Sequence, residues 1–145
     1  MSDFTVLHAS TFEASDTPVF AHAAAVAQAG NARLVSMHAS IGEVAHPPEF
    51  QETLDRWGYE GVDFQMIDHP CCEDAVDTLL NGIRGQDPEL VVLGTHGRSG
   101  LQLWAEGSMS QAVVANVDGP VLVVPLSGRK LVDLETGRFA LRKVL

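Results

Sequence analysis

The chain alternates apolar, strand-like runs with helix-like segments along most of its length. This alternation is the feature that most constrains the fold. The five apolar runs cover residues 4–9, 32–39, 62–67, 89–93 and 120–125. The helix-like segments between them cover residues 16–29, 47–57, 72–84 and 108–117. Because several runs are apolar throughout, the pattern predicts an α/β domain whose parallel sheet is covered by helices on both faces. Right-handed crossovers make such a sheet doubly wound.

A glycine-rich segment, GTHGRSGLQLWAEGS, follows the fourth run and spans residues 94–108. It therefore starts at the carboxyl edge of the sheet, where doubly wound domains bind ligands. Gly107 and Ser108 open the next helix, whose first amides and dipole favour an anion. Arg98 adds a positive charge that can bind phosphate. The segment predicts a polyphosphate cradle, with a glycine-rich turn and a capping serine as the alternative.

The spacing separates this segment from three better-known loops. No Gly-Lys-Ser/Thr closes it, as a Walker loop requires. The dinucleotide fingerprint has tighter spacing and follows the first strand. Ser99 is not in a Gly-x-Ser-x-Gly nucleophile elbow.

The segments VVLGTHGRSG, EGS and GPVLVV together resemble the C-terminal signature of the universal stress protein family. That signature is Gly-x2-Gly-x9-Gly-Ser/Thr between the fourth and fifth strands, and the spacing here matches it without a gap. The resemblance covers residues 4–126. It implies a flavodoxin-like, doubly wound sheet of five parallel strands in the order 3-2-1-4-5. It also implies a homodimer that acts in stress responses and binds ATP.

The resemblance also assigns the nucleotide contacts residue by residue. The phosphate contacts would be Gly94, Gly97, Arg98, Gly107, Ser108 and the amide of Met109. The adenosine side would be built from Ala9, Thr11, Ala39 and Leu93. Thr11 stands where ATP-binding members usually carry an aspartate, so it offers no carboxylate to the adenosine. The expected cofactors are ATP, with AMP as the alternative, and Mg²⁺, which lowers the charge of the phosphates.

The last eighteen residues depart from the α/β pattern. Residues 1–127, the nucleotide-binding domain, hold four arginines against seventeen acidic residues, a net charge of −13. Residues 128–145 hold five basic and two acidic residues, a net charge of +3. Two strand-like runs flank Thr136 and Gly137, so the tail predicts a C-terminal hairpin. We expect this hairpin to pack on the acidic body at a dimer interface formed with the fifth strand. Its apolar side would be Leu131, Leu134, Phe139, Leu141 and Val144.

The preferred function is an adenine-nucleotide-binding regulatory protein of the stress response, with an unidentified protein partner. The alternative is a dimeric interaction or chaperone-like module that binds no nucleotide, which Thr11 favours. A third hypothesis is a slow ATPase. Glu106 and His96 are the nearby candidates for a general base, and no catalytic residue is assigned.

Charge and composition exclude several other classes. A formal net charge of −10 argues against a basic face that binds nucleic acid. No apolar stretch reaches the roughly 18 residues of a membrane span. The N-terminal residues lack the pattern of a secretory signal, so none is expected. Cys71 and Cys72 are adjacent, so they cannot link distant parts of the fold. A cytoplasmic protein is expected.

The histidines and cysteines allow several interpretations. We expect His8 to be a core histidine with satisfied hydrogen bonds and His22 to be a partly exposed surface group. His38 and His96 either shape the nucleotide pocket or make structural hydrogen bonds. The run from His69 to Cys72 could bind a metal, sense redox state, or simply bury two small residues at a helix start. No metal site built from protein side chains is predicted.

Overall fold

The fold is described from a computed structural model of the 145-residue chain. The structure describes residues 4–10, 16–41, 48–59, 61–71, 75–95, 109–125 and 130–140. Within these ranges, only the backbone is described for residues 40, 41, 70, 71, 75 and 109.

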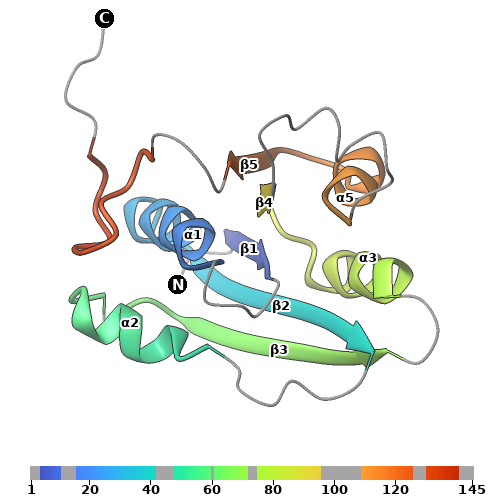
Figure 1. The fold of residues 1–145 in the computed structure, drawn as a ribbon, viewed down its shortest axis with the longest axis horizontal. Coiled ribbons are helices and arrows are strands. Elements are labelled where there is room, and N and C mark those ends of the chain that lie inside the picture. The colour runs from blue at the N-terminus through green and yellow to red at the C-terminus, as the bar shows by residue number, and fades with distance from the viewer. Residues whose placement is uncertain are drawn as a thin grey trace, which may run out of the picture.

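A five-stranded, all-parallel sheet in the order β3-β2-β1-β4-β5 forms the centre of the domain (Figure 1). Its strands are β1 (Thr5–Ala9), β2 (Arg33–Ile41), β3 (Phe64–Cys71), β4 (Leu90–Thr95) and β5 (Val121–Pro125). The helices are α1 (Thr17–Ala29), α2 (Phe50–Arg56), α3 (Ala75–Gln86) and α5 (Met109–Asn116). The predicted fold class and strand order are confirmed.

The alternation of side chains along each strand divides the core into two layers. On β1, Val6 belongs to the layer beneath α1 and α2, whereas Leu7 belongs to the layer beneath α3 and α5. On β4, Val92 and Val91 divide between the layers in the same way. Figure 1 shows α1 and α2 on one side of the sheet and α3 and α5 on the other. The inner strands β1, β2 and β4 are therefore largely buried on both faces, as a covered parallel sheet requires, whereas Met66 on the edge strand β3 is exposed.

Local signals in the sequence account for most element boundaries. Pro18 stands in the first turn of α1, where its missing N–H costs nothing. The third strand differs from its predicted range, because β3 runs from Phe64 to Cys71 instead of ending at residue 67. Pro70 is tolerated there because β3 lies at the edge of the sheet. Cys71 is thus a strand residue and not part of a helix start.

Among the described helices, none has the length and apolar character needed to cross a membrane.

Residues 130–140 of the tail pack against the α1–α2 side of the same chain (Figure 1). Val132 is 2% exposed and joins the core layer beneath α1 and α2. The Tyr59 hydroxyl donates to the Gly137 carbonyl at 2.7 Å, and the Arg138 guanidinium lies 5.1 Å from the centre of the Tyr59 ring. These contacts fix the tail segment to the segment that follows α2.

The described part of the tail, residues 130–140, has no regular strand and contains one isolated antiparallel bridge, between Val132 and Phe139, so the hairpin predicted for residues 128–145 is not shown. A turn lies inside this bridge, and Gly137 has a φ of +69°. Leu131, Leu134 and Phe139, expected to form an apolar packing side, are exposed in the single chain. Leu141 and Val144 lie outside the described residues.

We expect Gly137→Ala to destabilise the fold more than Gly58→Ala. Both glycines have positive φ, so both substitutions carry the backbone cost of about 1 kcal/mol. A Cβ at Gly137 would also lie 2.5 Å from the Trp57 ring, whereas a Cβ at Gly58 meets nothing within 4 Å. Overpacking adds about 1–3 kcal/mol. Urea unfolding followed by tryptophan fluorescence would measure both variants, and equal losses would contradict the close packing of the tail on Trp57.

Candidate functional site

The carboxyl ends of β1, β2 and β4 meet at one edge of the sheet. The pairing of β1 with β4 extends to His8 and Val92, and its pairing with β2 extends to Ala9 and Met37. The described candidate residues at this edge are Ala9, Ala39, Leu93, Gly94 and the backbone of Met109. The remaining candidates, Thr11, Gly97, Arg98, Gly107 and Ser108, lie outside the described residues, as do His96 and Glu106.

The order of the strands reverses beside this edge. The chain places β2 and β3 on one side of β1, and β4 and β5 on the other. The switch point of the sheet therefore falls between β1 and β4, where doubly wound domains bind ligands. Beyond Val92 the described pairing of β4 continues only with β5, up to Thr95 and Pro125. Gly94 thus lies where β1 and β4 have stopped pairing.

The start of α5 is tied to this point by a contact that sequence analysis missed. The Ser110 hydroxyl donates to the Gly94 carbonyl at 2.8 Å. Ser110 is two residues beyond Ser108, so its only sequence signal was a hydroxyl in the first turn of a helix. The bond fixes the positive end of the helix dipole beside the end of β4.

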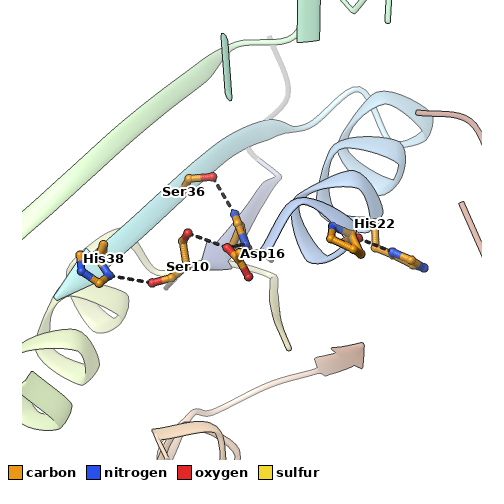
Figure 2. A network of polar contacts seen from close by, with 7 residues as sticks. Ser10, Asp16, His22, Ser36 and His38 are labelled. Carbon is orange, nitrogen blue, oxygen red and sulfur yellow. Dashed lines mark hydrogen bonds and ion pairs between the residues drawn. The ribbon is translucent and has the colours of Figure 1, made fainter. Parts of the chain in front are cut away.

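A buried polar cluster underlies the end of β1 (Figure 2). His8 is fully buried, and its Nδ1 lies 2.9 Å from Ser36 Oγ on β2. Its Nε2 lies 2.7 Å from Asp16 Oδ2, at ion-pair distance but without regular hydrogen-bond geometry within the described structure. The regular hydrogen bond to that oxygen comes from Ser10 Oγ, at 2.6 Å. His8 is buried in the core, as predicted, but the prediction that its hydrogen bonds are satisfied holds for Nδ1 and not for Nε2. Its ring also contacts Phe20 and Phe50.

The spatial series Ser36–His8–Asp16 does not form a hydrolytic triad. Ser36 is fully buried, so its hydroxyl cannot reach a substrate. The ring is also oriented the wrong way, because Nδ1 faces the serine and Nε2 faces the aspartate. The cluster is therefore structural, and it fixes the first residue of the segment that leaves β1.

Two other histidines make defined contacts. His38, half-buried near the carboxyl end of β2, uses Nδ1 to donate to the Ser10 carbonyl at 2.9 Å. The prediction for His22 is wrong, because this residue is 3% exposed. Its Nδ1 donates to the Pro18 carbonyl at 2.6 Å, and its Nε2 accepts the Leu131 N–H at 3.2 Å. The tail covers His22, which local sequence does not reveal.

The run from His69 to Cys72 is only partly described. His69 lies on β3, half-buried, and packs beside Gly82 of α3. No group of three or more candidate metal ligands occurs within the described residues, and Cys72 lies outside them.

Fold and site together define a flavodoxin-like, doubly wound α/β domain with a candidate ligand site at its switch point. Residues 72–125 match the model of the universal stress protein family. This match confirms the resemblance carried by the glycine spacing. A sequence comparison with curated proteins finds no match.

Solved structures with the same fold cover most of the chain. A universal stress protein in complex with cAMP superposes with a TM-score of 0.64 at 21% identity, over 86% of this chain and 98% of that one. A universal stress protein from Archaeoglobus fulgidus in complex with dAMP gives 0.56 at 18% identity, over 83% and 96%. The protein UspA from Lactobacillus plantarum gives 0.58 at 17% identity, over 86% and 99%.

We expect Asp16→Ala to destabilise the protein strongly, because it removes a buried acceptor from Ser10 and His8. Leaving a buried donor such as the Ser10 hydroxyl without its acceptor costs about 1–3 kcal/mol. Asp55→Ala is the control: Asp55 is exposed and accepts a bond from Gln51 one turn away, so its loss costs about 0.5 kcal/mol or less. Chemical denaturation would measure the free energy of unfolding of both variants, and similar decreases would contradict the role of Asp16 in the core.

Proposed function

We propose that this protein is a cytoplasmic stress-response regulator that binds an adenine nucleotide at the carboxyl edge of its sheet. The observation that carries the proposal is the position of Gly94 and the start of α5 at the switch point beside β1. The match to the universal stress protein family supports it. Two proteins of the same fold, solved in complex with cAMP and dAMP, support an adenine ligand.

ATP is the preferred ligand because the sequence offers a cradle long enough for several phosphates. Gly94, Gly97, Gly107 and the Met109 amide would supply backbone contacts. Arg98 and Ser108 would bind phosphate oxygens with their side chains. Ala9, Thr11, Ala39 and Leu93 would surround the adenosine. Mg²⁺ would be held chiefly by the phosphates, since no protein ligand set for it is assigned.

The second candidate is an interaction module that keeps the fold without binding nucleotide. One observation favours it: Leu131, Leu134 and Phe139 expose apolar side chains on one short segment. We also propose that the protein is a homodimer formed through β5 and the tail. β5 is an edge strand of the described sheet, and Lys130 of the tail binds the Pro125 carbonyl at its end.

ATP with Mg²⁺ should bind the purified protein and raise its melting temperature by mass action. Gly107→Val should abolish this shift, because a branched side chain fills the space that a phosphate needs. Gly61→Val is the matched control, since a Cβ at Gly61 meets nothing within 4 Å and Gly61 precedes β3, away from the carboxyl edge. Calorimetry and thermal shift that both stay flat at millimolar ATP for the wild type would favour the interaction module.

Thr11→Asp should strengthen the binding of adenosine nucleotides. A carboxylate can accept two hydrogen bonds from the nucleoside, and charged acceptors form stronger bonds than a hydroxyl. Isothermal titration of AMP against both proteins would measure the change. An unchanged or weaker affinity in the variant would place the adenosine away from Thr11.

A further inference from the structure

Ser10 directly follows β1 and is held by three hydrogen bonds, two to neighbouring residues of β2 and one to the residue before α1. Its amide donates to the Met37 carbonyl of β2 at 2.8 Å. Its hydroxyl donates to Asp16 Oδ2, just before α1, at 2.6 Å. Its carbonyl accepts from His38 Nδ1, near the end of β2, at 2.9 Å. Figure 2 shows Ser10 between Asp16 and His38.

We infer that Ser10, fixed by Asp16 and His38, is a positioning residue that sets the β1 side of the nucleotide site. This inference rests on the proposed function. Ser10 itself is 8% exposed, so it acts through the backbone it holds and not as a principal ligand contact.

The end of β1 needs such support because the sheet no longer holds it on both sides. The pairing with β4 reaches only His8, and the pairing register with β2 reaches Ala9. Past these points, hydrogen bonds outside the regular strand pairing determine where the backbone lies. The Asp16 bond is the part of this support that depends on the side chain of Ser10, and burial protects it from competition with water.

The carboxylate of Asp16 is buried and used by contacts within the protein. It is 3% exposed, and one of its oxygens meets both Ser10 Oγ and His8 Nε2. A carboxylate in this position cannot fork across two donors of an adenosine as well. The acid nearest the end of β1 in the described structure thus positions the backbone, and recognition on this side would come from the backbone that Ser10 holds.

Ser36 provides a matched control within the same cluster. It is fully buried, and its hydroxyl lies 2.9 Å from His8 Nδ1. It pairs with His8 within the strands and not at their ends. Ser36→Ala therefore removes a comparable buried hydroxyl and lowers stability, but leaves all three bonds of Ser10 in place.

The test is the affinity for ATP with Mg²⁺, measured by isothermal titration at a temperature where circular dichroism shows every variant folded. We expect Ser10→Ala to weaken ATP binding about tenfold, because the variant loses the hydrogen bond to Asp16 that holds the backbone at the site. Ser36→Ala should change the affinity less than about twofold. Both should lower the melting temperature. Ser10→Thr, which restores the hydroxyl, should recover most of the affinity. If Ser10→Ala does not fold, Ser10→Cys replaces it, because a thiol is close in size to the hydroxyl but is a weaker donor. Ser10→Cys should then bind ATP more weakly than both the wild type and Ser36→Ala.

Each result is decisive. If Ser10→Ala binds as tightly as the wild type, or if Ser36→Ala loses as much affinity as Ser10→Ala, the positioning role is overturned and the proposed function stands. If the wild type binds neither ATP nor AMP, the proposed function fails and this role fails with it.

Discussion

The central position of β1 is the constraint on which the rest of the structure depends. β1 pairs with β2 on one side and with β4 on the other, so both halves of the sheet are built onto it. Right-handed crossovers then force the helices onto opposite faces, which buries most of β1, β2 and β4 on both faces. The same arrangement creates the switch point beside β1. One strand therefore determines both the core and the place where a ligand can enter.

Most of the fold could be predicted because its signals are local. An apolar run such as that of residues 90–93 can be buried on both faces only in a covered parallel sheet. Pro18 marks the start of α1 in the sequence itself. The predictions for His22 and for the end of β3 were wrong because contacts with distant parts of the chain determine both. His22 is buried because the tail lies over it, 109 residues further along the chain, and β3 continues through Pro70 because an edge strand tolerates proline.

The candidate site likewise has one part that local sequence predicts and one part that it does not. The glycine spacing marked the end of β4 and the start of α5, since the motif is contiguous. The buried cluster beneath β1 has no contiguous pattern, because Ser36 lies 28 residues from His8 and Asp16 precedes a helix. Asp16 looked like an ordinary helix start, yet its side chain makes no capping bond and is used by Ser10 and His8 instead.

The charge of the domain explains why backbone geometry matters so much to the proposed function. Residues 1–127 hold seventeen acidic residues, four arginines and no lysine, so their overall field repels a polyphosphate. Side-chain cations can therefore supply only part of the attraction, with Arg98 as the candidate in the glycine segment. The remainder would come from Mg²⁺ and from backbone amides at a helix start, which attract anions without carrying net charge. Amides are effective only when their direction and distance are fixed. A site of this kind relies on residues such as Ser10 and Ser110, which hold the backbone at the ends of β1 and β4.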